Sequence, residues 1–312
     1  MSNSFAIVFP GQGSQSIGML SELADAHAIV RQTYAEAAEV LGYDLWDLIQ
    51  QGPEEQLNQT MKTQPAMLAA GVAVWRTWID QGGADPQLMA GHSLGEYTAL
   101  VCAGALEFSA AVKLVAERGR FMQEAVPEGS GGMAAILGLD DEKVKAVCSQ
   151  AATGDVVEAV NFNSPGQVVI AGDKAAVERA CGLAKEAGAK RALPLPVSVP
   201  SHCALMKPAA ERLGQLLSET AINSPTIAVI HNASVEFAAD PGSIQAQLEA
   251  QLYSPVRWVE TVQKMAASGI SNLLEAGPGK VLAGLTKRID RQLVGLPLFD
   301  SKSLTQALEE LK

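Results

Sequence analysis

The hydrophobic pattern of the chain alternates between short strands and longer helices. Continuous apolar runs at residues 5–9 and 88–90 predict two buried strands. Helical periodicity follows each of them, over residues 22–81 with an interruption at Gly52-Pro53, and then over residues 94–103 and 109–125. Buried strands separated by helices are typical of a parallel sheet that is covered on both faces.

A segment in the middle of the chain has a different rhythm. It begins after residues 127–132, where a proline and three glycines indicate a boundary. The elements expected after it are a strand, a helix, two strands, a helix and a strand, at residues 133–137, 140–150, 156–162, 167–171, 173–187 and 190–195. This β-α-β-β-α-β order is the ferredoxin-like unit. We therefore expect an α/β fold with a large domain of residues 1–126 and 199–312 and an inserted α+β subdomain of residues 127–198.

Composition and charge exclude several classes of protein. The sequence has no apolar run of about 18 residues, the length that a membrane span needs, and its N-terminus lacks the features of a signal peptide. The formal net charge of −11 disfavours nucleic acid and anionic membranes as partners. The four cysteines show no metal-binding spacing, so we expect free thiols in a reducing compartment. These features favour a cytoplasmic location without a metal site.

The sequence Gly91-His92-Ser93-Leu94-Gly95 carries the clearest chemical signal. It matches G-x-S-x-G between a predicted strand and a predicted helix. In that pattern the glycines permit a sharp turn, and the serine hydroxyl stands at a helix N-terminus, where backbone N–H groups can hold an oxyanion. A tight turn with a helix-capping serine is the structural alternative. We predict that Ser93 is a nucleophile.

A serine nucleophile needs a base, and the sequence has four histidines. His27 lies in a polar helical stretch, His92 should point to the other side of the turn, and His231 adjoins a loop. His202 follows the predicted return of the chain to the large domain, and clefts form at such seams. We therefore predict that His202 is the base, although a structural histidine would also fit. Cys203, its neighbour, is a less favoured nucleophile.

Arg118 occupies an unusual position in the predicted helix of residues 109–125. The polar face of this helix carries Lys113, Glu117, Arg120 and Glu124, and the apolar face carries Ala111, Leu114, Val115, Phe121, Met122 and Ala125. Arg118 falls on the apolar face, where a charge costs free energy unless an anion meets it. The residue pattern alone leaves open whether that anion is a ligand or an internal carboxylate, or whether the side chain reaches past the apolar face to solvent.

Two glycine-rich loops do not fit nucleotide-binding motifs. The loop after the first strand has Ser16 where G-x-G-x-x-G requires its third glycine, and residues 277–280 do not form a Walker A loop. The first of these loops can still supply an oxyanion donor.

Together these residues resemble the malonyl-CoA:acyl carrier protein transacylase family. The resemblance covers nearly the whole chain. Its motifs are Phe-Pro-Gly-Gln-Gly-Ser-Gln at 9–15, Gly-His-Ser-Leu-Gly-Glu-Tyr at 91–97, Glu-Arg-Gly at 117–119, Asn-Phe-Asn-Ser-Pro-Gly-Gln at 161–167, Pro-Ser-His at 200–202, Gln-Leu-Tyr-Ser-Pro-Val-Arg-Trp at 251–258 and Glu-Ala-Gly-Pro-Gly at 275–279.

The resemblance implies a fold and a set of roles. The large domain would be α/β-hydrolase-like and the insertion ferredoxin-like. Ser93 would carry the acyl group and His202 would be its base. The remaining implied roles are oxyanion donors at Gln12 and Leu94, a malonyl carboxylate site at Arg118, orientation of His202 by the main-chain carbonyl of Gln251, and a channel position at Asn161, with Asn163 as its alternative. The predicted cycle needs no metal and no other cofactor.

The implied partners are malonyl-CoA and an acyl carrier protein. Such carriers are acidic, and the chain has two basic pairs, Lys190-Arg191 and Lys287-Arg288, which we predict to form the docking surface unless they are ordinary solvated surface. Related modular-synthase domains often carry His-Ala-Phe-His where this chain has residues 199–202, so methylmalonyl stays open as the acyl group. The rival functions are an esterase or thioesterase on the same fold, and an assembly subunit with a vestigial site.

Overall fold

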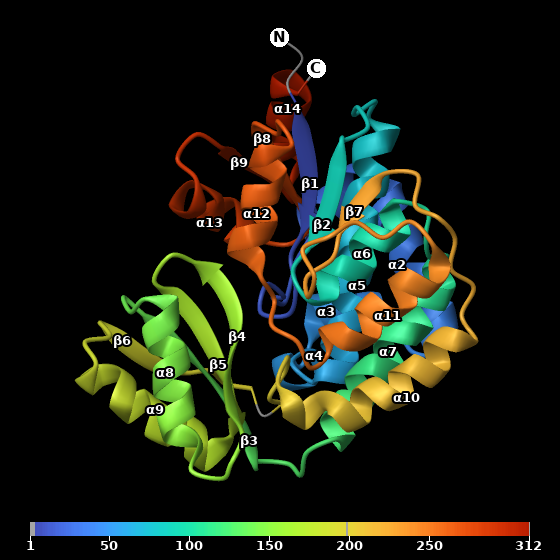
Figure 1. Ribbon diagram of the computed structural model, residues 1–312. Coiled ribbons are helices and arrows are strands. Elements are labelled where there is room, and N and C mark those ends of the chain that lie inside the picture. The colour runs from blue at the N-terminus through green and yellow to red at the C-terminus, as the bar shows by residue number, and fades with distance from the viewer. Residues whose placement is uncertain (1–3, 198, 312) are drawn as a thin grey trace.

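Two sheets organise the chain in the computed structural model, which describes residues 4–197 and 199–311 (Figure 1). The larger sheet has five parallel strands in the order β7-β2-β1-β8-β9. Its strands are β1 (Phe5–Phe9), β2 (Leu88–Gly91), β7 (Ala228–Ile230), β8 (Asn272–Ala276) and β9 (Val294–Leu298). Side chains that alternate along β1 pack on opposite faces of the sheet: Ile7 and Phe9 contribute to one core, and Ala6 and Val8 to another. The sheet is therefore buried on both faces, as its continuous apolar strands predict.

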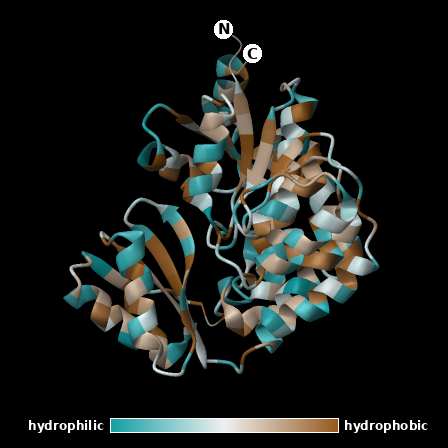
Figure 2. Ribbon diagram, viewed as in Figure 1, coloured by the Kyte–Doolittle hydropathy of each residue, from teal (hydrophilic) through white to brown (hydrophobic). Residues whose placement is uncertain are grey.

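Helices cover both faces of this sheet. One core is built with α1 (Ser21–Ala26), α2 (Ala28–Leu41), α3 (Leu45–Gln51), α4 (Glu54–Leu57), α5 (Thr60–Asp80), α6 (Leu94–Cys102), α7 (Phe108–Glu124), α10 (Lys207–Ser218), α11 (Pro241–Gln251) and α14 (Ser301–Glu310). The other core is built with α12 (Trp258–Ala267) and α13 (Val281–Ile289). A short 3₁₀ turn, η1 (Ala204–Met206), precedes α10. Hydrophobic residues lie along the strands, whereas hydrophilic residues lie on outward faces of the helices (Figure 2).

The smaller sheet is antiparallel, with the order β4-β5-β3-β6. Its elements are β3 (Gly131–Leu137), α8 (Asp141–Ala152), β4 (Val157–Ser164), β5 (Gln167–Asp173), α9 (Lys174–Glu186) and β6 (Arg191–Pro194). The helices α8 and α9 pack on one face of this sheet. The element order is the predicted ferredoxin-like one, and the boundaries of its strands and helices differ from the predicted ones by at most two residues.

The edge of the smaller sheet is joined to the large domain by backbone hydrogen bonds. Phe162 N–H donates to the Val256 carbonyl at 3.0 Å, and Val256 N–H donates to the Val160 carbonyl at 2.8 Å. The β4 strand therefore has a fixed place beside the segment that leads into α12 (Figure 1).

The α/β fold class, with a parallel sheet and a small antiparallel sheet, is confirmed. The helical stretch predicted over residues 22–81 consists of five separate helices. The predicted interruption at Gly52-Pro53 falls between α3 and α4, and capping residues and turns divide the pattern at further points. The proposed domain ends at residues 1, 198 and 312 lie outside the described residues. Among the residues that the structure describes, no helix combines the length and apolar character needed to cross a bilayer.

Candidate active site

Ser93 stands on a strained turn between β2 and α6. Its φ of 53° and ψ of −108° are unfavourable for a residue with a side chain. A Cβ atom at Gly91 would lie 1.8 Å from the carbonyl carbon of Gly95, so only glycine lets the chain fold back so closely. The turn therefore has the form of a nucleophile elbow.

The His202 imidazole lies between Ser93 and a main-chain carbonyl. Its Nδ1 is 2.8 Å from the Gln251 oxygen, which can only accept, so Nδ1 carries the ring proton. Its Nε2 is 2.7 Å from Ser93 Oγ, and its lone pair therefore accepts from the serine hydroxyl. No carboxylate bonds to His202 within the described chain. The serine and histidine thus form a nucleophile–base pair that a backbone carbonyl orients.

The surroundings of His202 keep it neutral. Burial, and then the positive charge of Arg118, lower the pKa of His202 from its ordinary 6.5 to about 3, against the opposing effect of the hydrogen bond to the Gln251 carbonyl. The backbone of His202 has a φ of 68°, and its N–H donates to the Leu252 carbonyl at 3.0 Å. A neutral imidazole in a fixed orientation is the form that can accept the serine proton.

Two backbone N–H groups near the serine have no partner among the described residues. They belong to Leu94, the first residue of α6, and to Gln12, in the loop after β1. The N–H of Ser93 itself is occupied, because it donates to Asn232 Oδ1 at 2.7 Å. The N–H groups of Leu94 and Gln12 are therefore free to bind an oxyanion, and their role as its donors stays a prediction.

The loop that carries Gln12 packs directly on the serine turn. β1 and β2 are parallel neighbours, with Phe9 opposite Gly91, so both loops leave the same edge of the sheet. A Cβ atom at Gly11 would lie 2.4 Å from the His92 carbonyl oxygen, which explains the glycine before Gln12. This contact places Gln12 beside the elbow.

Arg118 lies on the buried face of α7, and only 1% of its surface is exposed. One of its terminal nitrogens donates to Gln64 Oε1 and the other to Gln251 Oε1, each at 2.9 Å. A guanidinium has five N–H donors, so three have no partner in the described structure. Arg118 forms no salt bridge with a described carboxylate, and its guanidinium lies 5.2 Å from the centre of the Tyr97 ring. It is a buried cation whose free donors suit an anionic ligand.

The two asparagines of β4 lie differently. Asn163 Oδ1 is 2.8 Å from Nε2 of His92, whose ring is partly buried and lies 5.6 Å from the ring of Trp258. Asn161 pairs with Val256 through its backbone, and its Oδ1 has no described partner. The contact between the subdomain and the serine turn is therefore made by Asn163, and the channel role of Asn161 stays a prediction.

Four further side chains belong to the hydrogen-bond network of the site, and the sequence predicts no role for them. They are Gln64, Glu96, His231 and Asn232. Glu96 could have been noticed, because it is the single charged residue in the otherwise apolar helix of residues 94–102. Gln64 and Asn232 lie far from the serine in sequence, and no pattern marks them.

The other candidate residues lie outside the reacting pair. The predicted Cys203 alternative is a buried thiol whose Sγ contacts the Pro200 carbonyl at 3.1 Å. The cysteines are all free, and His27 lies at the junction of α1 and α2. No group of three or more possible metal ligands is found among the described residues.

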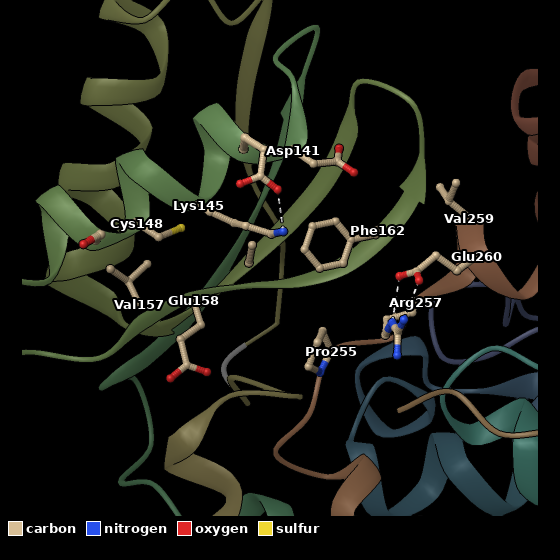
Figure 3. A pocket seen from close by; sticks show the side chains of 13 residues that line it. Asp141, Lys145, Cys148, Val157, Glu158, Phe162, Pro255, Arg257, Val259 and Glu260 are labelled. Atoms are coloured by element: carbon tan, nitrogen blue, oxygen red, sulfur yellow. Dashed lines mark hydrogen bonds and ion pairs between the residues drawn. The ribbon is translucent and has the colours of Figure 1, made fainter. Parts of the chain in front are cut away.

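A separate hollow of about 630 Å³ lies where α8 and β4 face the start of α12 (Figure 3). Its two cations are already paired, Lys145 with Glu142 and Arg257 with Glu260. Neither Ser93 nor His202 lines this hollow, so it is not the site of the nucleophile.

Comparisons with known proteins match this geometry to one family. The model of the acyl transferase domain matches residues 6–293. The malonyl CoA-acyl carrier protein transacylase of Escherichia coli (strain K12) is 59% identical over 305 residues, which cover 98% of the chain and 99% of that protein.

Solved structures agree over the same extent. An acyl carrier protein S-malonyltransferase from Vibrio cholerae superimposes with a TM-score of 0.95 at 62% identity, covering 97% of this chain and 99% of that one. A malonyl-transacylase in complex with its type II PKS acyl-carrier protein has a TM-score of 0.98 at 58% identity, covering 98% and 99%. The chain therefore belongs to the acyl transferase family and, within it, to the malonyl CoA-acyl carrier protein transacylases.

Proposed function

We propose that this chain transfers the malonyl group from malonyl-CoA to the phosphopantetheine thiol of an acyl carrier protein through an ester on Ser93. The observation that carries the proposal is the place of Arg118. It is a buried cation without a carboxylate partner among the described residues, and a single side chain, Gln251, connects it to the Ser93 carbonyl. An acyl group with a terminal carboxylate matches both the nucleophile and this charge.

The first half-reaction forms the ester. Ser93 Oγ attacks the thioester carbonyl carbon while His202 Nε2 takes the hydroxyl proton. The N–H groups of Gln12 and Leu94 stabilise the oxyanion, each by about 3 kcal/mol of barrier. The C–S bond then breaks, and His202 gives its proton to the departing coenzyme A thiolate.

The second half-reaction reverses these steps with a new thiol. The phosphopantetheine thiol attacks the ester carbonyl, His202 takes its proton, and Ser93 leaves with that proton. Each step has a protein group to carry it, so the proposed cycle uses no cofactor. A cytoplasmic location is part of the proposal, and the four free cysteines support it.

The direct test separates transfer from hydrolysis. The chain is mixed with malonyl-CoA in the presence or absence of phosphopantetheinylated carrier protein, and malonyl-carrier and free malonate are both measured. We expect malonyl-carrier to form and malonate release without carrier to be far slower. Malonate release as fast as transfer would instead indicate a thioesterase.

The low pKa of His202 predicts an unusual pH dependence. A base works when it is deprotonated, so the rate falls as the pH drops through its pKa, and that pKa lies below 6.5 here. We expect kcat/KM for acylation by malonyl-CoA to stay level from about pH 8 down to about pH 5. Stopped-flow detection of released coenzyme A measures this profile. A half-maximal rate near pH 6.5 would show that the pKa of His202 is not lowered in the free enzyme.

A series of contacts links the two predicted basic pairs, Lys190-Arg191 and Lys287-Arg288, which together are called the rim. Arg191 is opposite Leu137 in the β6–β3 register, and Leu137 is opposite Gln167 in the β3–β5 register. Arg288 donates to Gln167 Oε1 at 2.7 Å. All four basic side chains are exposed, so the end of the small sheet and the end of α13 present their positive charges together.

Reversing this rim should weaken docking. With Lys190, Arg191, Lys287 and Arg288 all changed to Glu, we expect kcat/KM for the carrier protein to fall by about tenfold or more at low salt, because complementary charges steer association. Added salt should reduce the difference in kcat/KM between this variant and the wild type. The matched control changes two exposed lysines on other elements, Lys143→Glu and Lys302→Glu. Unchanged carrier kinetics in the rim variant would place the docking surface elsewhere.

A further inference from the structure

Glu96 is a fully buried carboxylate on α6, three residues after the nucleophile. It receives three hydrogen bonds. Oε1 lies 2.7 Å from His231 Nδ1, and Oε2 accepts from Asn232 N–H at 2.9 Å and from Gln251 Nε2 at 2.8 Å. No lysine or arginine among the described residues forms a salt bridge with it. Its hydrogen-bond partners are an imidazole, a backbone N–H group and a side-chain amide.

The amide of Gln251 is the element that this carboxylate controls. Both amide hydrogens are used, one by Glu96 Oε2 and the other by the Ser93 carbonyl at 3.0 Å. The amide oxygen must therefore face the other way, where it accepts from Arg118. A turned amide would present N–H groups to the guanidinium and leave it without this acceptor.

We propose that Glu96 is a positioning residue for acyl selectivity: it fixes the Gln251 amide, and this amide holds Arg118 where the carboxylate of the acyl group binds. The inference rests on the proposed function, because it concerns the selectivity of the same site. Glu96 does not touch the reacting atoms. It acts through the side chain of Gln251 on Arg118. His202 depends instead on the main-chain carbonyl of Gln251, so a change at Glu96 should alter acylation by acetyl-CoA, which has no terminal carboxylate, less than acylation by malonyl-CoA.

Two conservative substitutions separate geometry from charge. Glu96→Asp keeps the charge but withdraws the carboxylate by one methylene, so it cannot reach all three donors from the same backbone. Glu96→Gln keeps the length. Its amide oxygen can still accept from Gln251 and Asn232 if its nitrogen faces His231 and that ring changes tautomer. The change would leave a proton on His231 Nε2, which has no described partner, so Glu96→Gln should lower the melting temperature.

The experiment measures kcat/KM for acylation of Ser93 by malonyl-CoA and by acetyl-CoA, together with the melting temperature of each variant. For Glu96→Asp we expect the malonyl-to-acetyl ratio to fall by about tenfold or more, mainly through KM for malonyl-CoA. For Glu96→Gln we expect a ratio within about threefold of wild type despite its lower melting temperature. Glu39→Asp, at an exposed position on α2, is the matched control.

Each other outcome overturns the inference. A Glu96→Asp ratio equal to wild type would show that the amide needs no such support. Equal losses with both substrates would make Glu96 a general structural residue, and a lost ratio in Glu96→Gln alone would show that its charge acts rather than its geometry. A wild-type chain that forms no malonyl ester would overturn the proposed function itself, which distinguishes that failure from the others.

Discussion

Replacing His202 with alanine should slow formation of the malonyl ester by roughly 10²- to 10⁴-fold, the usual contribution of a general base. The reason is that Nε2, 2.7 Å from Ser93 Oγ, is the acceptor for the serine proton, and the described chain offers this hydroxyl no other base. Without it the serine stays a neutral alcohol and a poor nucleophile. Rapid-quench mass spectrometry of the acyl-enzyme measures this rate directly.

The control for this variant is His27→Ala, which removes a histidine at the junction of α1 and α2, away from the reacting pair. It should acylate at the wild-type rate. If His202→Ala acylated within a few-fold of wild type while keeping its fold, another group would have to be the base.

Replacing Arg118 with alanine should lower kcat/KM for malonyl-CoA by roughly 100-fold or more, while acetyl-CoA holds or improves. Malonyl differs from acetyl by one carboxylate, and a guanidinium can bind it through two parallel hydrogen bonds. The same buried cation penalises acetyl, because its charge would be left without an anion. Removing the guanidinium therefore weakens binding of the malonyl group and removes the cost that the unpaired charge imposes on the acetyl group. Acylation kinetics with both thioesters give the two values.

Two further variants sharpen this prediction. Arg118→Lys should recover only part of the malonyl activity, since an ammonium lacks the planar fork of a guanidinium. Arg120→Ala removes an arginine from the outer face of the same helix, where it pairs with Glu117 and Glu124, and should leave the ratio unchanged. An equal fall for both thioesters in Arg118→Ala would make Arg118 a structural residue and move selectivity to another group.

The local parts of the fold and the site could be predicted from the sequence. The elbow at Ser93 is a contiguous motif between a strand and a helix. Its glycines have one steric explanation, because a Cβ atom at either position would clash with nearby backbone. The position of Arg118 on an apolar helix face also showed that its charge needs explanation. In both cases the signal lies within a few turns of chain, where periodicity and sterics act directly.

The connections between distant segments could not be predicted in the same way. The bond from His202 to the Gln251 carbonyl was expected only from the family resemblance, because a backbone acceptor leaves no mark on its side chain. Glu96, His231 and Asn232 meet across more than 130 positions of sequence, and only the order of the sheet, with β7 beside β2, brings them together. The break at Gly52-Pro53 was predicted from the sequence, but the other divisions within residues 22–81 were not, because the helical period continues across those turns.

The central claim is that Ser93 carries the malonyl group between two thiols. Intact-mass measurement after mixing the chain with malonyl-CoA tests it most directly, with Ser93→Ala as the matched variant and phosphopantetheinylated carrier protein added afterwards. The account predicts one malonyl adduct on the wild-type chain, none on Ser93→Ala, and loss of the adduct as malonyl-carrier appears. An adduct of wild-type yield on folded Ser93→Ala, or a wild-type adduct that the carrier does not remove, would contradict it.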